Sequence, residues 1–124
     1  MIPRRVVEVV LARDHGQCVI AGPGCLGAAS VADHRANRGM GGAKALDVPV
    51  NLIAACGLCN GAKENAKGTD LEVLRNRGVR VLRAATVAAT LDRCAISPVM
   101  YPDGSWWLLD HAGGREEANV VQGR

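Results

Sequence analysis

The stretch NLIAACGLCN, residues 51–60, is the part of the sequence that decides the fold. A run of strand-forming apolar residues leads directly into Cys56 and Cys59, whose Cys-x-x-Cys spacing is typical of one half of a zinc site. Upstream, Cys18 and Cys25 bound a glycine-rich loop and supply the other half, at a longer spacing. Four thiolates saturate a tetrahedral zinc ion, so the predicted zinc is structural. The alternative is two buried thiols in a loop beside a redox-active Cys-x-x-Cys pair.

A structural zinc would compensate for a thin hydrophobic core. The chain has 124 residues, which predicts one domain, and its apolar residues are mainly alanine, valine and leucine. It contains no phenylalanine, and its large aromatic residues are Tyr101, Trp106 and Trp107. Because this composition buries little area per residue, we expect zinc binding to contribute directly to the free energy of folding. The fifth cysteine, Cys94, is interpreted as a small buried hydrophobic residue.

Helices and short strands alternate along the chain. Apolar residues at helical spacing from Val6 to Leu11 predict an N-terminal helix with Pro3 at its first position, although the valine run also suits a strand. A capping box at residues 69–72 predicts the start of a later helix. Residues 79–94 fit neither the helical nor the strand period. The other predicted elements are two short strands, a helix and a β-hairpin, at residues 30–34, 48–55, 56–67 and 96–109.

Two adjacent residues of the first short strand carry side chains suited to catalysis. Asp33 and His34 point to opposite sides of an extended strand, so they can perform separate tasks. A neutral imidazole can accept a proton from water, and a carboxylate can hold a hard cation. The plainer alternative for His34 is a histidine whose hydrogen bonds are satisfied in the core or at the surface.

Two asparagines flank the Cys-x-x-Cys region. Asn60 directly follows Cys59, so zinc would fix its position, and its amide oxygen could complete the shell of a magnesium or manganese ion held by Asp33. The alternative for Asn60 is a helix cap. Asn51, between the two strands, could bridge backbone groups of the loop and so fix the imidazole of His34. The alternative for Asn51 is an ordinary turn residue.

Taken together, residues 12–67 resemble the HNH endonucleases, the ββα-metal group of nucleases, and particularly their small phage-encoded members. The resemblance covers about half of the chain. It rests on the four cysteines, Asp33-His34-Arg35, the segment 38–42, Asn51-Leu52 and the segment 56–63. It implies an α+β fold, in which a small zinc-stapled ββα-metal core carries flanking helices and a C-terminal β-hairpin.

The resemblance also implies a role for each site residue. His34 would activate water, and Asp33 and Asn60 would hold a catalytic Mg²⁺ or Mn²⁺ ion. Asn51 matches the middle asparagine of the motif. The last position of the motif is often histidine, so Asn60 departs from the usual pattern, as it does in phage junction-resolving relatives. This departure keeps a metal ligand and removes a titratable group.

The implied function is a metal-dependent DNA endonuclease that hydrolyses phosphodiester bonds. Basic residues near the motif predict phosphate contacts from Arg35, Arg38 and Lys63, and the formal net charge of +3 suits such a partner. Glycines at positions 39, 41 and 42 would permit close backbone approach. Two alternatives lack catalysis: a silent zinc-dependent DNA-binding module and a zinc-stapled protein-interaction domain. Neither of these alternatives needs the trio of Asp33, His34 and Asn60.

The resemblance suggests a setting in phage genome processing or packaging, with DNA as partner and with a homodimer or packaging proteins as further partners. We expect a cytoplasmic protein, in the host cytoplasm if it is phage-encoded. No segment approaches the ~18 consecutive apolar residues of a membrane span, and the first residues lack the pattern of a secretory signal.

Three segments are expected along the chain. Residues 1–68 would form the nuclease core with its N-terminal helix, and residues 69–110 would add a helix and a β-hairpin packed on that core. Residues 111–124, which are polar and contain glycine, would form a flexible tail. The pair Trp106-Trp107 on the hairpin would pack in the core or, alternatively, stack on bases or dock a partner.

Overall fold

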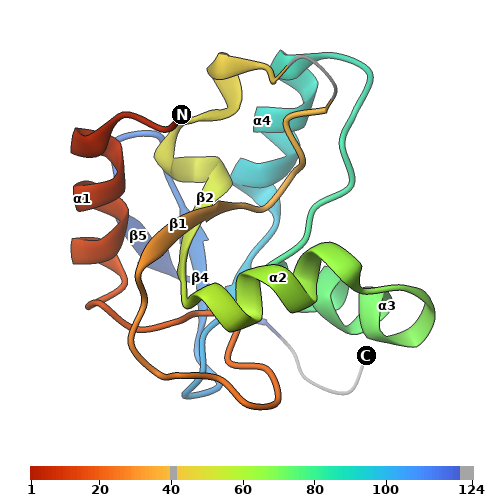
Figure 1. Cartoon of the computed structure of the whole chain (residues 1–124). Coiled ribbons are helices and arrows are strands. Elements are labelled where there is room, and N and C mark those ends of the chain that lie inside the picture. The colour runs from red at the N-terminus through yellow and green to blue at the C-terminus, as the bar shows by residue number, and fades with distance from the viewer. Residues whose placement is uncertain (40–41, 121–124) are drawn as a thin grey trace.

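The computed structural model describes residues 1–39 and 42–120 (Figure 1). It has the mixed composition of helices and small antiparallel sheets that the sequence predicts. The elements, in chain order, are α1 (Arg4–Arg13), β1 (Val31–His34), the 3₁₀ turns η1 (Lys44–Leu46) and η2 (Pro49–Asn51), β2 (Leu52–Ala55), α2 (Gly57–Asn65), α3 (Gly68–Asn76), α4 (Val87–Ile96), β3 (Val99–Met100), β4 (Trp106–Leu109) and β5 (Arg115–Glu117).

A two-stranded sheet followed at once by a helix forms the centre of the molecule (Figure 1). Strands β1 and β2 pair antiparallel, with His34 opposite Leu52 and Asp33 opposite Ile53. All four residues of β2 are buried. Helix α2 begins directly after this strand, with Cys56 as its N-cap residue. The zinc-ligand segment therefore passes from a buried strand into a helix, as the sequence predicts.

The second sheet contains one strand more than predicted. Strands β3, β4 and β5 pair antiparallel in that order, and Arg115 lies opposite Leu109. The carboxylate of Asp110 accepts hydrogen bonds from the backbone N–H groups of Ala112 and Gly114, both at 2.9 Å, and so closes the turn before β5. The prediction of a flexible tail from residue 111 is therefore wrong for this strand. Residues 121–124 lie outside the described part of the chain.

Two helices begin at residues other than those predicted, and a third lies in a segment that the sequence left ambiguous. Pro3 is the N-cap residue of α1, not its first helical residue. Helix α3 begins at Gly68, ahead of the predicted capping box, and no side chain caps it. The ambiguous segment 79–94 contains most of α4, whose N-cap Thr86 accepts a hydrogen bond from the N–H of Ala89 at 3.0 Å. Each start depends on backbone geometry that a residue pattern specifies only within a residue or two.

A buried polar network joins α1 to both sheets. The guanidinium of Arg13 makes two 2.9 Å bonds to the carboxylate of Asp14 and donates to the carbonyl of Leu52. Asp14 also accepts from the N–H of Ala54 at 2.9 Å and from the hydroxyl of Tyr101 at 2.5 Å. Burial and the nearby Asp14 carboxylate raise the pKa of Tyr101, which keeps its hydroxyl protonated as a donor. These bonds add specificity to a core built mainly from small aliphatic residues.

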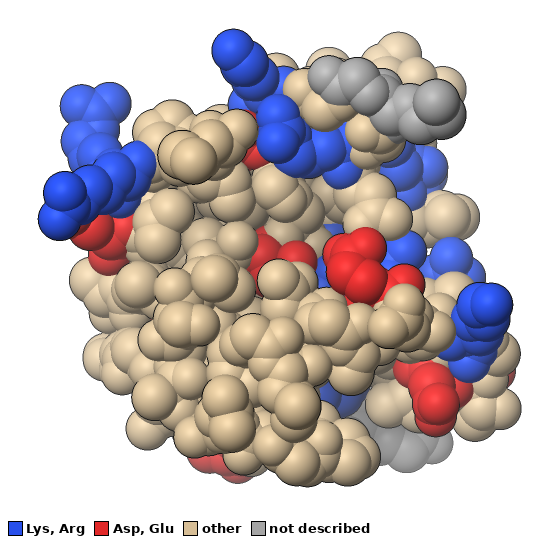
Figure 2. Space-filling view, viewed as in Figure 1, with Lys and Arg blue, Asp and Glu red and all other residues tan. Residues whose placement is uncertain are grey.

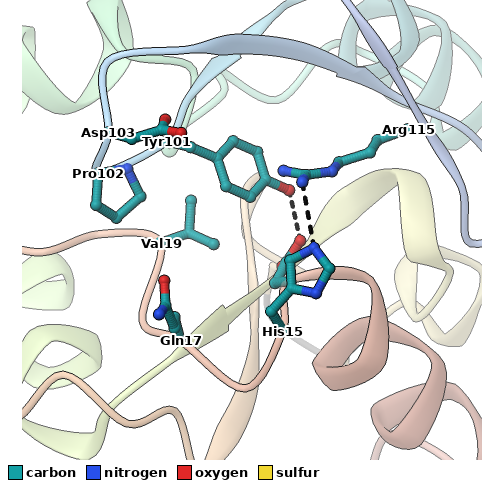
Figure 3. Close-up of a pocket in the computed structure, with 8 residues that line it drawn as sticks. His15, Gln17, Val19, Tyr101, Pro102, Asp103 and Arg115 are labelled. Atoms are coloured by element: carbon teal, nitrogen blue, oxygen red, sulfur yellow. Dashed lines mark hydrogen bonds between the residues drawn. The ribbon is translucent and has the colours of Figure 1, made fainter.

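Aromatic residues pack beside this network, and Figure 3 shows Tyr101 together with Arg115. The guanidinium of Arg115 lies 3.9 Å from the ring centre of Trp107 and 4.6 Å from that of Tyr101. Trp107 packs against the hydrophobic core, and its indole N–H donates to the hydroxyl of Ser105 at 2.7 Å. For Trp107, core packing is therefore the better of the two interpretations.

Candidate functional site

The four predicted zinc ligands lie together. One Sγ atom from each of Cys18, Cys25, Cys56 and Cys59 lies within 4.8 Å of every other. A tetrahedral zinc ion with Zn–S bonds of about 2.3 Å separates its sulfur ligands by roughly 3.8 Å, so a small contraction of this cluster would complete the site. The prediction of a four-cysteine metal site is confirmed as a set of positions able to hold a metal ion.

Backbone N–H groups stabilise the thiolate form of one cysteine in this cluster. Cys56 Sγ accepts from the N–H of Cys59 at 3.3 Å, and the pKa of Cys56 is lowered to about 6 by hydrogen bonds from the backbone of Leu26 and Cys59. Burial raises the pKa of Cys59 to about 12 and also raises that of Cys18. A bound cation would stabilise the thiolate form of its cysteine ligands.

Arg77 holds the upstream cysteine loop in place through hydrogen bonds to its backbone. Its guanidinium donates to the carbonyls of Ile20 at 2.6 Å, Val19 at 3.0 Å and Met100 at 3.2 Å. Because these carbonyls lie on the cysteine loop and on β3, Arg77 ties the metal cluster to the second sheet.

Asp33 and Asn60 meet between β1 and α2. Asp33 is 5% exposed, and the amide of Asn60, with its nitrogen toward Asp33, donates to the two carboxylate oxygens at 3.0 Å and 3.2 Å. Turned over, the same amide would place its oxygen at that position. Neighbouring oxygens in an octahedral shell with bonds of about 2.1 Å are roughly 3 Å apart. The distances between the two side chains match that spacing, and Asn60 does not cap its helix, whose N-cap residue is Cys56.

Lys63 lies at the same carboxylate. Its side chain is buried, and its ammonium donates to the carbonyl of His34 at 2.8 Å and lies 3.2 Å from Asp33 Oδ2. Burial raises the pKa of Asp33, and the positive charge of Lys63 offsets part of that rise. The predicted contact of Lys63 with a phosphate is not supported. The residue is only 1% exposed, and its ammonium neutralises an internal carboxylate.

Arg35 occupies the interior and does not face solvent. It is 0% exposed, and its guanidinium donates to the carbonyls of Gly78 at 2.9 Å, Val50 at 2.9 Å, Cys94 at 3.0 Å and Ser97 at 2.6 Å. Burial lowers its pKa to about 10, so it stays charged near neutral pH. The predicted phosphate contact is a misreading: Arg35 joins the segments around α4 to the central sheet.

Replacing Arg35 tests this internal role. Arg35→Met is expected to lower the free energy of unfolding by about 3 kcal/mol or more, because four carbonyls lose a charged donor. Arg35→Lys should recover only part of this loss, since an ammonium cannot reproduce the planar set of donors. Denaturant unfolding of the zinc-loaded protein measures both effects. Unchanged stability with weakened DNA binding would restore the phosphate-contact hypothesis.

Asn51 is buried beneath the candidate site. Its amide oxygen accepts from the N–H of Ala36 at 2.8 Å, and its amide nitrogen donates to the carbonyls of Ala36 and Leu46, both at 3.1 Å. It thus bridges two backbone segments, as one of the two sequence interpretations predicts. Its side chain is 0% exposed, which makes it a positioning residue.

His34 projects to the side of β1 away from Asp33 and meets an unpredicted residue. Its Nε2 lies 2.6 Å from Oδ1 of Asp47, whose side chain is 4% exposed. The Nε nitrogen of Arg38 lies 3.3 Å from the same oxygen, and its guanidinium also donates to the carbonyl of Gly42. The sequence motif does not identify Asp47, because this residue lies 13 residues from His34 and only the fold brings the two together.

Basic side chains lie at the upper left, at the top and on the right of the molecular face in Figure 2. Of the three predicted nucleic-acid contacts, Arg38 alone keeps a partly exposed side chain, at 24%. Arg83 is exposed and donates to the carbonyls of Asn37 and Arg38, and Lys44 is exposed on η1. Arg38, Lys44 and Arg83 are here called the basic rim. Sequence position alone did not identify Arg83, because it follows the motif by many residues.

The glycines near the basic rim have a structural explanation. Gly39 and Gly42 have positive φ angles of 77° and 63°. An added Cβ at Gly39 would collide with the guanidinium of Arg83, and one at Gly42 would crowd that of Arg38. Their predicted role in close backbone approach to DNA stays a prediction, and Gly41 lies outside the described residues.

No protein-family model, curated protein or solved structure matches the chain. Among the described helices, none is long and apolar enough to cross a membrane.

Proposed function

We propose that the protein is a metal-dependent DNA endonuclease of the HNH, or ββα-metal, type. The observation that carries the proposal is the meeting of Asp33 and Asn60 at 3.0 Å and 3.2 Å, directly beside the four-cysteine cluster. Asp33 lies on β1 and Asn60 on α2, with β2 between them along the chain, which is the strand–strand–helix order that the resemblance implies. Half-buried His34 on the same strand supplies a proton acceptor.

In the proposed reaction, His34 accepts a proton from the water that attacks a backbone phosphorus. Asp33 and Asn60 would hold Mg²⁺ or Mn²⁺, which supplies Lewis-acid stabilisation of the negative charge on the phosphate and on the leaving oxygen. Asn51 keeps the backbone after His34 fixed to the segment before Asp47. Zinc on the four cysteines has a structural role in this scheme, because four ligands leave no open position.

A catalytically silent zinc-dependent DNA-binding module is the second candidate. The ammonium of Lys63 favours it, because this group already neutralises Asp33 without any divalent ion. Such a module would bind DNA and would leave every strand intact. The two candidates therefore differ in a single measurable activity.

Nicking of supercoiled plasmid distinguishes these candidates. The zinc-loaded protein should convert supercoiled plasmid to the open circular form when Mg²⁺ or Mn²⁺ is added. It should be inactive when these ions are omitted and zinc is retained. Because one site cuts one strand, linear product should require a dimer or two encounters. DNA binding with no nicking under any of these ions would favour the silent module.

The basic rim predicts binding through phosphates with little preference for sequence. Affinity should fall steeply as salt rises, since each phosphate contact contributes about −0.9 to the slope of log K against log salt. Removing two exposed charges in the double variant Lys44→Ala, Arg83→Ala should reduce the magnitude of that slope by about two. The matched double variant Arg4→Ala, Arg5→Ala, on α1, should keep the parent slope. A flat salt response in the parent would contradict this contact surface.

The biological setting is part of the same proposal. The resemblance to small phage-encoded members favours genome processing or packaging in the host cytoplasm, with packaging proteins or a second copy of the chain as further partners. Co-purification of the tagged protein from infected cells would test these partners directly.

A further inference from the structure

We propose that Asp47 is the positioning residue for His34: its carboxylate accepts the Nε2 proton, which leaves Nδ1 as the atom that accepts a proton from water. The distance between Nε2 and Asp47 Oδ1 is 2.6 Å. An ionised carboxylate can only accept hydrogen bonds, so a neutral imidazole at this distance must carry its proton on Nε2. The remaining ring nitrogen, Nδ1, then has a free lone pair.

The surroundings of His34 and Asp47 support placing the imidazole proton on Nε2. Among the described residues, no protein group forms a hydrogen bond with Nδ1 of His34. The His34 side chain is 18% exposed. The imidazole therefore has one nitrogen that is bonded to the protein, and the proposal assigns the other, Nδ1, to a water molecule. A histidine whose ring nitrogens were both satisfied internally would offer no such position.

Asp47 is itself held in place. Its backbone N–H donates to the carbonyl of Lys44 at 3.0 Å, and Arg38 Nε lies 3.3 Å from the oxygen that His34 contacts. The Asn51 amide joins Ala36, which follows His34 on the chain, to Leu46, which precedes Asp47. One buried amide therefore sets the spacing between the backbone segments that carry the imidazole and its carboxylate.

The part of this inference that concerns water activation rests on the proposed endonuclease function. The part that concerns the position of the proton does not, because the hydrogen bond exists with or without a substrate. A carboxylate that fixes the tautomer of a catalytic histidine has a large effect in serine proteases, where replacing the aspartate with asparagine lowers kcat by about 10⁴. The same physical effect is expected here, at a size set by how rigidly Asp47 is held.

Nuclear magnetic resonance of the ¹⁵N-labelled, zinc-loaded protein tests the proton position. In its neutral form, His34 should show a directly observed Nε2 proton that exchanges slowly, and an unprotonated Nδ1. Asp47→Asn should lose this slowly exchanging proton, while Asp92→Asn, the same chemical change at an exposed position on α4, should retain it. A parent protein with its proton on Nδ1 would overturn the proposal without any variant.

Kinetics of plasmid nicking test the catalytic consequence separately. Asp47→Asn should lower kcat at least about tenfold and keep its zinc content, because the four cysteines are untouched. The variant also removes the carboxylate charge beside Arg38 of the basic rim, so kcat and KM are measured separately. Parent activity in a variant that has lost the Nε2 proton would overturn the positioning role. If the parent protein shows the expected Nε2 proton but does not nick DNA, the proposed function fails and the hydrogen-bond assignment stands.

Discussion

Replacing Cys59 with serine is expected to unfold the protein and not merely to lower its activity. Cys59 is buried in the first turn of α2, and its sulfur lies within 4.8 Å of the other three thiols. Structural zinc contributes on the order of 10 kcal/mol in zinc-finger peptides, which is comparable to the total stability of about 5–15 kcal/mol of a typical domain. The small aliphatic side chains of this core supply too little hydrophobic stabilisation to replace the contribution of zinc.

Metal analysis and circular dichroism measure this effect. The parent should retain about one zinc per chain after dialysis, in keeping with a single four-thiolate site. Cys59→Ser should lose both the zinc and the cooperative thermal transition. Removing zinc from the parent with a chelator should produce the same unfolding.

Cys94 supplies the matched control for this prediction. It is 0% exposed and buried like the ligands, but its thiol contacts the amide oxygen of Asn51 and lies outside the four-thiol cluster. Cys94→Ala should therefore keep its zinc and lose only a modest part of its stability. A folded, zinc-free parent with an unchanged melting temperature would disprove the structural role of the metal.

The central unit was predictable because its signals are local. Each of its parts is encoded within a few residues: an apolar strand, the Cys-x-x-Cys spacing and a helix that begins at the second thiol pair. Strand β5 lacks such a signal, since Arg115–Glu117 is polar and becomes a strand only because β4 and the Asp110 turn lie beside it. Propensity alone describes such a segment as a loop.

In the candidate site, too, the features encoded locally were predicted and those that depend on distant segments were not. Asp33 and Asn60 were predicted to meet, and they do, because a strand and the following helix fix their relative positions. The assignments of Arg35 and Lys63 failed because a position near a motif does not reveal whether a long basic side chain points inward. Asp47 was missed because its link to His34 depends on how residues 35–46 fold back, and no local pattern encodes that path.

His34→Ala is expected to lower the rate of plasmid nicking by about 10²- to 10⁴-fold, the usual contribution of a general base. Folding, zinc content and DNA affinity should stay close to those of the parent, because the His34 side chain is half-buried and contacts neither the zinc cluster nor the exposed charges of Lys44 and Arg83. His111→Ala, which removes an exposed histidine from the turn before β5, is the matched control and should nick at the parent rate.

Asn60→Ala should show a different pattern, because it removes a proposed ligand of the divalent ion and keeps the proton acceptor. Its nicking rate should recover in part as Mn²⁺ is raised, whereas His34→Ala should not respond to the metal concentration. Asn60 is a better probe than Asp33, whose carboxylate also neutralises buried Lys63, so that its loss would leave an unpaired internal charge. Nicking rates of His34→Ala, Asn60→Ala and the control His111→Ala across metal concentration separate these roles. If His34→Ala cuts DNA at the parent rate in nuclease-free preparations, the catalytic assignment fails and the silent DNA-binding module takes its place.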